Sequence, residues 1–320
     1  MIKLFRLLTV AFLVFITLQS CSKPSKKAPV SPESVTVDSP YIKTSREKYP
    51  AIASQNPPEL KNGLQGLVKL FVEHKITGKT LKDKDTSGSY IAKGTGGVIV
   101  HDGRWFIITA RHVLVPNKDI KQFTDPEDPD EVIELKSTTS LGTRIVIGSA
   151  SAKPSRIWFS IVHDIAVLEV ENKTQFALAA ILHKDSKAPI NIKPNSKLIE
   201  AGAEVEAWGF PAKHHPQVEK PSISSVTPKY FVLNRALLRG FSGGLVLRET
   251  QSDSDVVKTP LGIISRADDQ ANQTTVLDWE IAKDIFDAAI SGKKLAGLVA
   301  VSVPGKTKVG GLDFSVSGIR

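Results

Sequence analysis

A serine set among glycines is the residue of this sequence best placed to do chemistry. Residues 240–244 read G-F-S-G-G, so Ser242 lies in a backbone that can turn sharply. A serine hydroxyl is a poor nucleophile until a neighbouring imidazole accepts its proton. Two upstream residues have the required types: His112, just past one apolar run, and Asp164, at the start of another. The order histidine, aspartate, serine therefore predicts a serine nucleophile served by a histidine base.

The same pentapeptide also fits the G-x-S-x-G elbow of α/β-hydrolases. That motif requires a strand before the turn, a helix after it, and a histidine further downstream. No histidine follows His215, and residues 245–247 read L-V-L, which is typical of a strand. Both observations exclude the elbow.

Four short motifs in chain order carry a resemblance to the chymotrypsin-like serine proteases. T-A-R-H-V around His112 resembles their T-A-A-H segment, and D-I-A-V-L from Asp164 resembles D-I-A-L-L. G-F-S-G-G around Ser242 resembles G-D-S-G-G, and G-I-I-S at residues 262–265 resembles the G-I-V-S strand of the substrate cleft. The resemblance covers roughly residues 62–292 and implies two six-stranded β-barrels with the reactive residues at their junction.

The resemblance also implies a role for each residue. His112 takes the proton of Ser242 and later protonates the leaving amine, while Asp164 holds the tautomer of His112. The backbone amides of Gly240 and Ser242 form the oxyanion hole. The primary substrate pocket is expected at residues Ala236, Leu237, Ser265, Arg266 and Ala267.

Several positions depart from the family pattern. Phe241 replaces the acid that in trypsin-like zymogens receives a new N-terminal amine, so we expect no activation by that route. Arg111 is a bulky charge where small residues are common. With no acid in the expected pocket, we expect small or apolar residues on the N-terminal side of the cleaved bond. We expect His163 to face away from the cleft if Asp164 faces it, because neighbouring residues of an extended chain point to opposite sides.

Short apolar runs rich in β-branched and aromatic residues predict an all-β sandwich or barrel. Residues 94–100 and 105–109, joined by His101-Asp102-Gly103, predict a hairpin. One helix is predicted near the end of the chain, capped by Asp278 and ended by Gly292. The expected fold class is thus a chymotrypsin-like double β-barrel with a C-terminal helix, spanning residues 61–320 with a short tail.

The first residues predict a lipoprotein signal peptide over residues 1–20. Lys3 and Arg6 precede an apolar run at residues 7–18, and L-Q-S-C then resembles the bacterial lipobox, which places acylation at Cys21. Residues 21–60, rich in Ser, Pro and Lys, predict a disordered tether. Cys21 is the only cysteine, which excludes an intrachain disulfide and Cys-based metal sites.

The expected protein is a serine endopeptidase of the bacterial cell envelope, anchored by its lipid in the outer membrane and facing the periplasm. Its partners are a protein or peptide substrate and the membrane. We expect no cofactor and no metal, interpreting K-H-H-P at residues 213–216 and the acidic residues 125–131 as plain loops. The net charge of +9 comes from scattered residues, which argues against nucleic-acid binding. The alternatives are a non-catalytic binding or scaffold lipoprotein on the same fold, or a purely structural lipoprotein.

Overall fold

The computed structural model describes residues 61–115, 122–124, 132–148, 153–171, 190–211, 215–251, 256–309 and 312–317. All of them belong to one of the two compact units of the chain, Pro50–Arg320. The predicted signal peptide, the predicted tether, Cys21, residues 125–131 and His214 lie outside the described residues. Among the helices that are described, none has the length and apolar character needed to cross a membrane.

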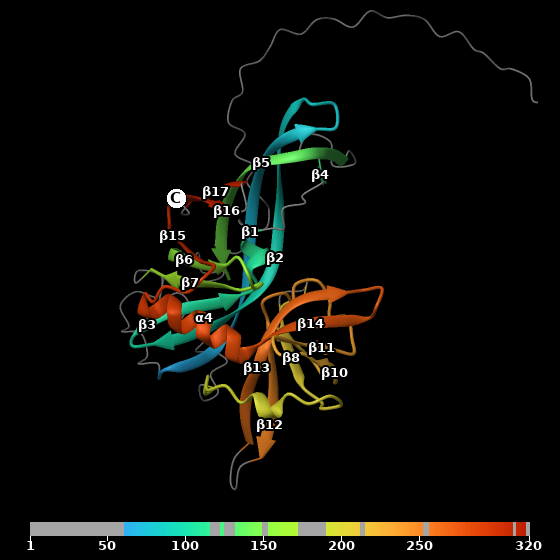
Figure 1. The fold of residues 1–320 in the computed structure, drawn as a ribbon, viewed down its shortest axis with the longest axis vertical. Helices are drawn as coiled ribbons and strands as arrows, with labels where there is room; N and C mark the ends of the chain where they lie inside the picture. The colour runs from blue at the N-terminus through green and yellow to red at the C-terminus, as the bar shows by residue number, and fades with distance from the viewer. Residues whose placement is uncertain are drawn as a thin grey trace, which may run out of the picture. The chain divides into compact units, whose positions relative to one another are not determined.

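A 10-stranded sheet forms the first half of the fold (Figure 1). Its strands follow the order β15-β6-β7-β3-β2-β1-β5-β17-β16, with β4 paired to β5. All pairs are antiparallel except β17 with β5. The bounds are β1 Gly63–Thr80, β2 Asp85–His101, β3 Arg104–Thr109, β4 Gln122–Thr124, β5 Val132–Ile147, β6 Pro154–Ser160, β7 Ala166–Val170, β15 Leu298–Ser302, β16 Gly305–Val309 and β17 Leu312–Ser317.

A 7-stranded antiparallel sheet forms the second half, in the order β10-β11-β14-β13-β12-β8-β9. Its bounds are β8 Glu206–Gly209, β9 Gln217–Glu219, β10 Ile223–Val226, β11 Tyr230–Leu233, β12 Leu245–Gln251, β13 Val256–Asp268 and β14 Gln273–Asp278. The described helices are α2 Arg111–Leu114, the 3-10 turn η1 Ser196–Leu198 and α4 Trp279–Ser291.

Alternating side chains of single strands fill different cores, which explains the unbroken apolar runs in the sequence. In β3, Ile107 packs into the core of the first sheet, whereas Phe106 and Ile108 face a core shared with the second sheet. In β12, Leu245 joins the shared core and Val246 joins the core of the second sheet. The strands that carry the site are therefore anchored on both faces.

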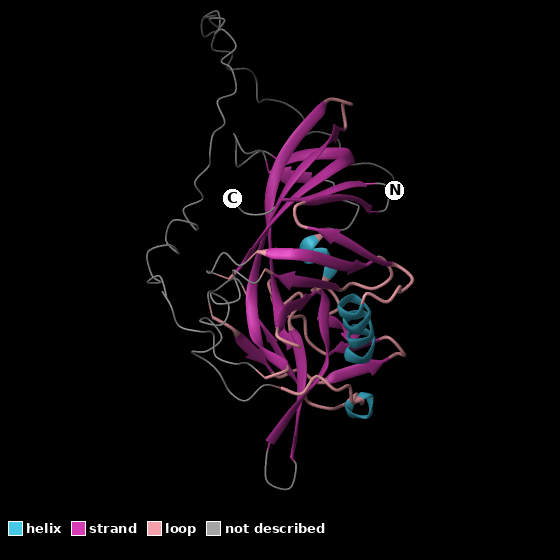
Figure 2. Ribbon diagram, turned by 90° about the vertical axis from the view of Figure 1, so that its left-hand side faces the viewer, coloured by secondary structure: helices cyan, strands magenta, loops and turns pink. Residues whose placement is uncertain are grey.

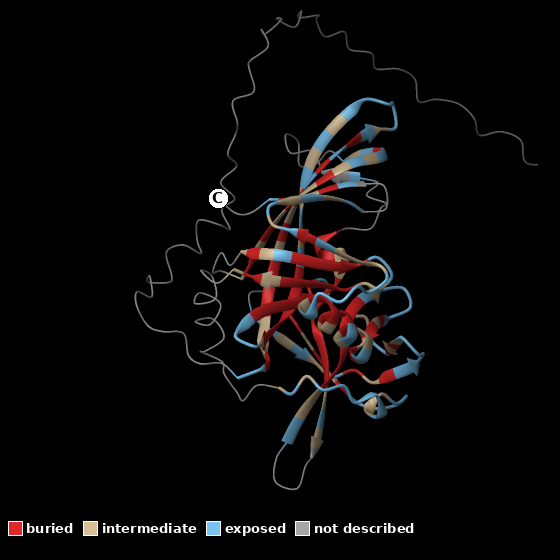
Figure 3. Ribbon diagram, turned by 60° about the vertical axis from the view of Figure 1, so that its left-hand side comes forward, coloured by how far each residue is buried: buried red, intermediate tan, exposed pale blue. Residues whose placement is uncertain are grey.

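The long strands are buried only along part of their length. The first residues of β2 alternate between exposed and half-buried, and burial becomes continuous from Gly94 to Val100 (Figure 3). Most of this buried part, from Gly96 to Val100, pairs with β3.

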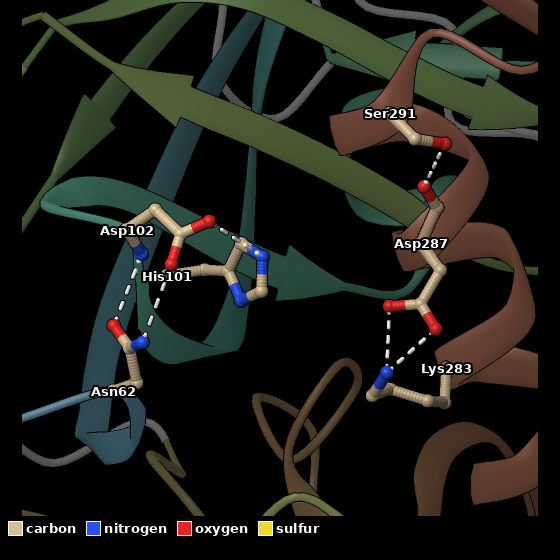
Figure 4. A network of polar contacts seen from close by, with 6 residues as sticks. All are labelled: Asn62, His101, Asp102, Lys283, Asp287 and Ser291. Carbon is tan, nitrogen blue, oxygen red and sulfur yellow. Dashed lines mark hydrogen bonds and ion pairs between the residues drawn. The ribbon is translucent and has the colours of Figure 1, made fainter.

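The predicted hairpin between β2 and β3 is confirmed. Asp102 and Gly103 both have positive φ values, 49° and 71°, as a two-residue hairpin turn of the primed type requires. Asn62 holds this turn, because its side-chain oxygen accepts the Asp102 amide at 3.0 Å (Figure 4). His101 lies beside the turn, with its ring 3.4 Å from the Asp102 carboxylate.

The predicted C-terminal helix is also confirmed, with the predicted ends. The Asp278 side chain accepts the Glu280 amide at 2.7 Å, and Gly292 ends the helix at a φ of 68°. Helix α4, the longest cyan helix of Figure 2, packs against β13 and β14. Its buried residues, among them Trp279 and Phe286, complete the shared core.

The fold is the expected chymotrypsin-like double barrel with a C-terminal helix. It differs from the implied six strands per barrel because the chain beyond α4 adds strands to the first sheet. Strand β15 pairs with β6, and β17 pairs with β5. Phe314 of β17 is 1% exposed and its ring lies 5.9 Å from that of Phe159. The short tail of the sequence is thus part of the first core.

Candidate active site

His112 lies in α2, one turn of helix that begins directly after β3. Its backbone amide donates to Oδ1 of Asp164 at 2.9 Å. Its ring nitrogen Nδ1 lies 2.8 Å from Oδ2 of the same carboxylate. A carboxylate beside Nδ1 selects the tautomer in which Nδ1 carries the proton, which leaves Nε2 as the basic nitrogen.

Asp164 joins the two sheets through its carboxylate. It lies in the turn between β6 and β7 of the first sheet, and Ser265 of β13 in the second sheet donates its hydroxyl to Oδ2 at 2.6 Å. Burial would raise the pKa of Asp164, but the hydrogen bonds from His112 and Ser265 and the charge of His112 outweigh it and lower the pKa below the ordinary value. The Asp164 carboxylate is therefore held ionised.

Arg111 holds the turn that carries Asp164, which explains the charge that looked out of place in the sequence. Its guanidinium donates to the backbone oxygen of Ser160 at 3.1 Å. The Ser160 hydroxyl in turn accepts the amides of Val162 and His163 at 3.2 and 3.0 Å. These bonds fix the first part of the turn that carries Asp164.

His163 has a different neighbour from Asp164. Its Nδ1 lies 3.2 Å from the hydroxyl of Tyr230 on β11. Burial lowers the pKa of His163, and the nearby Lys229 ammonium lowers it further. This imidazole is directed to Tyr230, while that of His112 is directed to Asp164.

Ser242 lies in the turn before β12, and it shares one cavity with His112. The cavity has a volume of about 260 Å³. No hydrogen bond joins the Ser242 hydroxyl to another residue in the described part of the chain. Such nucleophile–base contacts are often long in a free enzyme and shorten when substrate binds.

Most backbone polar groups around Ser242 form hydrogen bonds, but two amides have no partner among the described residues. The carbonyls of Gly240, Phe241 and Ser242 each accept a hydrogen bond. The amides of Phe241, Gly243 and Gly244 each donate one, at 3.2, 2.7 and 2.7 Å. The amides of Gly240 and Ser242 donate to no other described residue. They are the two amides that the sequence resemblance assigns to the oxyanion hole.

Most of the predicted substrate pocket lines this cavity. Leu237, Ser265, Arg266 and Ala267 are among its lining residues, together with Leu238, Arg239, Phe241, Ile264 and Asp269. Ala236 was wrongly expected there: it is not among the lining residues, and its amide donates to the side-chain oxygen of Asn272 at 3.1 Å. The sequence analysis missed the rim residues Leu238, Arg239 and Asp269, which lie in loops where no apolar pattern marks a facing direction.

The described residues thus form a double barrel with a cavity lined by His112 and Ser242, and the Asp164 carboxylate is bonded to His112, an arrangement that suits a serine peptidase. A family model for the trypsin-like peptidase domain matches residues 94–253. The chain belongs to the trypsin-like peptidase family.

Solved structures with a similar fold are proteases of low sequence identity. An HtrA-type protease, AlgW, solved with a decapeptide, is 13% identical with a TM-score of 0.41, over 72% of this chain and 66% of that one. A serine endoprotease from Yersinia pestis is 16% identical with a TM-score of 0.38, over 72% and 64%. The chain thus spans slightly less than two thirds of these two proteins. The active form of the Rv3671c protease from M. tuberculosis is 14% identical with a TM-score of 0.38, over 92% and 98%. No curated protein matches the chain significantly in sequence.

Proposed function

We propose that this protein is a serine endopeptidase that hydrolyses peptide bonds through an acyl-enzyme, with Ser242 as nucleophile, His112 as base and Asp164 as the group that orients the base. The observation that carries the proposal is the Asp164 carboxylate. It binds both the amide and the ring of His112 and lies beside the cavity that holds Ser242.

Each residue has one task in the proposed reaction. The Ser242 oxygen bonds to the carbonyl carbon of the substrate while its proton passes to Nε2 of His112. The carbon–nitrogen bond then breaks, and His112 gives that proton to the departing amine. Water repeats the sequence on the acyl-enzyme, which releases the carboxylic acid and restores Ser242. Asp164 stays ionised throughout and stabilises the imidazolium.

The amides of Gly240 and Ser242 stabilise the negative charge that develops on the carbonyl oxygen. Donors already in place are worth more there than in water, because they need no rearrangement as the charge develops. Loss of one such donor costs about 3 kcal/mol of transition-state stabilisation. The unpartnered state of these two amides in the described chain supports this assignment.

The substrate is a protein or peptide with a small or apolar residue before the cleaved bond. Leu237, Leu238 and Ile264 give the cavity an apolar wall, which favours such side chains. The exposed guanidinium groups of Arg239 and Arg266 lie at the rim with the exposed carboxylate of Asp269.

The proposed location is the bacterial envelope, with a lipid on Cys21 in the outer membrane and the peptidase domain facing the periplasm. The support is the basic start, the apolar run at residues 7–18 and the lipobox-like L-Q-S-C. Two or more acyl chains give stable anchoring, whereas one gives marginal anchoring.

Hydrolysis tests the proposal. The full chain, purified in detergent, is incubated with a labelled protein substrate and a peptide library, and new termini are identified by mass spectrometry. We expect cleavage by the native protein and by Ser225→Ala, a change at an exposed serine on β10. Ser242→Ala and His112→Ala are expected to abolish it.

Two outcomes contradict the proposal. Equal cleavage by native protein and Ser242→Ala assigns the activity to another group or to a contaminant. No cleavage by folded native protein, combined with retained peptide binding, favours the non-catalytic binding lipoprotein.

A further inference from the structure

Thr95 of the first sheet makes two hydrogen bonds to the nucleophile loop, residues 240–244. Thr95 lies in β2 of the first sheet and is 0% exposed. Its hydroxyl donates to the backbone oxygen of Gly240 at 2.7 Å. Its amide donates to the backbone oxygen of Ser242 at 2.8 Å. Thr95 therefore fixes the carbonyl groups of Gly240 and Ser242, the residues on either side of Phe241.

The Thr95 hydroxyl both donates and accepts a hydrogen bond in this position. Besides donating to Gly240, it accepts the amide of Phe210 at 2.8 Å. A hydroxyl both donates and accepts, so serine or threonine can make this pair of bonds whereas valine, of equal shape, can make neither. Because the site is buried, a lost partner leaves the Gly240 oxygen and the Phe210 amide unsatisfied.

Thr95 is itself fixed by the strand that leads to His112. The hydroxyl of Thr109, the last residue of β3, donates to the backbone oxygen of Thr95 at 2.6 Å. Gly243 allows the close approach, because a Cβ there would overlap the Thr109 hydroxyl and the Thr95 oxygen. A chain of contacts thus runs from β3, the strand that precedes His112, through Thr109 and Thr95 to the loop that carries Ser242.

Phe241 supplies a second anchor, which is apolar. Its side chain is 0% exposed and belongs to the core of the second sheet with Val205, Ala207 and Leu237. Gly209 passes so close that a Cβ there would lie 2.6 Å from the Phe241 ring. At sequence position 241, where trypsin-like zymogens carry the acid that binds a new N-terminal amine, this chain has a phenylalanine whose ring lies in an apolar core.

We propose that Thr95 is a positioning residue that fixes the nucleophile loop in its reactive conformation, with Phe241 as apolar anchor, so that the Gly240 and Ser242 amides stay available to the substrate carbonyl oxygen without an N-terminal salt bridge. This inference rests on the proposed function for its catalytic consequence. Thr95 touches no reacting atom and acts only through the loop. The proposed positioning role depends on the Thr95 hydroxyl, whereas a role in packing alone would not.

The test compares Thr95→Val, which removes the hydroxyl and keeps the shape, with Thr95→Ser, which keeps the hydroxyl. Both are made in the full chain, and melting temperatures establish that each folds. With a peptide substrate we expect Thr95→Val to lower kcat about 100-fold, the lower end of the effect of losing one oxyanion donor, with KM changed less than about threefold. Thr95→Ser should retain kcat within about threefold. Thr95→Ala is the second hydroxyl-free variant if Thr95→Val does not fold.

Hydrogen exchange of the peptide that spans residues 240–244 gives a readout independent of activity. It is measured in the Ser242→Ala background. We expect faster exchange in this loop with Thr95→Val than with Thr95→Ser. If the native protein is inactive but the loop responds in this way, the positioning role stands and the proposed function fails. Unchanged exchange and kcat in Thr95→Val, or an equal loss in Thr95→Ser, overturns the positioning role.

Discussion

The carboxylate of Asp164 forms two hydrogen bonds with His112, one with the backbone amide at 2.9 Å and one with ring nitrogen Nδ1 at 2.8 Å. The first contact fixes the start of α2, and the second fixes the direction and tautomer of the imidazole. A single side chain thus orients both the residue and its ring. This pair is the rigid part of the candidate site, whereas Ser242 makes no hydrogen bond to it within the described residues.

Asp164→Asn tests the tautomer directly. An amide can present its NH₂ group to Nδ1, which favours the wrong tautomer of His112 while keeping the shape. We expect kcat to fall by about 10⁴-fold, with the fold intact. The measurement is peptide hydrolysis, with Asp284→Asn, an exposed change on α4, as the matched control. Activity within tenfold of native in Asp164→Asn contradicts the assigned role.

Ser265→Ala tests the bond that crosses from the second sheet to Asp164. Its loss removes a hydrogen bond to a charged group, worth about 1.5–3 kcal/mol, and raises the pKa of Asp164 toward the ordinary 3.8. A carboxylate whose pKa is lowered by folding stabilises the fold at pH values above its pKa in the unfolded chain. That contribution is lost as the pH falls through the lower pKa of the folded protein. The difference in unfolding free energy between Ser265→Ala and native protein should be full above pH 5 and shrink below about pH 4. Urea titrations at several pH values measure it, and a difference independent of pH argues against the charged bond.

His74 predicts acid sensitivity in the first core. It is 0% exposed, its Nδ1 lies 3.1 Å from the Thr143 hydroxyl, and burial lowers its pKa from 6.5 to about 4. The pKa of His74 is lower in the folded protein than in the unfolded chain, so the unfolded chain binds a proton first as the pH falls. The fold therefore keeps its full stability above pH 6.5 and loses stability as the pH falls from 6.5 toward 4. The loss should approach about 3 kcal/mol. His74→Gln should flatten this part of the stability profile, and an identical profile in both proteins would assign the loss to other groups.

Ala267→Trp tests the position of the substrate pocket. Ala267 is half-buried on the cavity wall, so an indole there should fill the space for an apolar substrate side chain. We expect kcat/KM for peptides with leucine before the cleaved bond to fall about 100-fold, an effect of the size of a lost apolar contact of about 3 kcal/mol. Labelling by a small fluorophosphonate should stay near native. Equal loss of both activities would mean that the change disturbs Ser242 rather than the pocket.

Local sequence patterns correctly predict the structural features that are set by residues close in the sequence, such as helix ends and strands. Asp278 and Gly292 mark the ends of α4 because capping acts within one turn. The apolar run of β3 likewise predicts a strand. The spatial meeting of His112, Asp164 and Ser242 was inferred from their types and order, together with the family motifs around them.

Contacts between distant residues were beyond this kind of reasoning. The bond from Ser265 to Asp164 crosses 101 positions, and the one from Thr95 to Gly240 crosses 145. A buried threonine in a strand looks like any other β-branched residue, so nothing local marks Thr95 as a clamp. Phe241 drew attention as a missing acid, and its burial shows why the loop holds a ring there instead.

Covalent labelling of the native full chain with a fluorophosphonate, followed by mapping of the adduct by mass spectrometry, tests the nucleophile most directly. We predict one adduct, on Ser242, that is lost in Ser242→Ala and forms at least about 100-fold more slowly in His112→Ala. An adduct on another serine, labelling that persists in Ser242→Ala, or no labelling of folded native protein would contradict the assignment of Ser242 as the nucleophile.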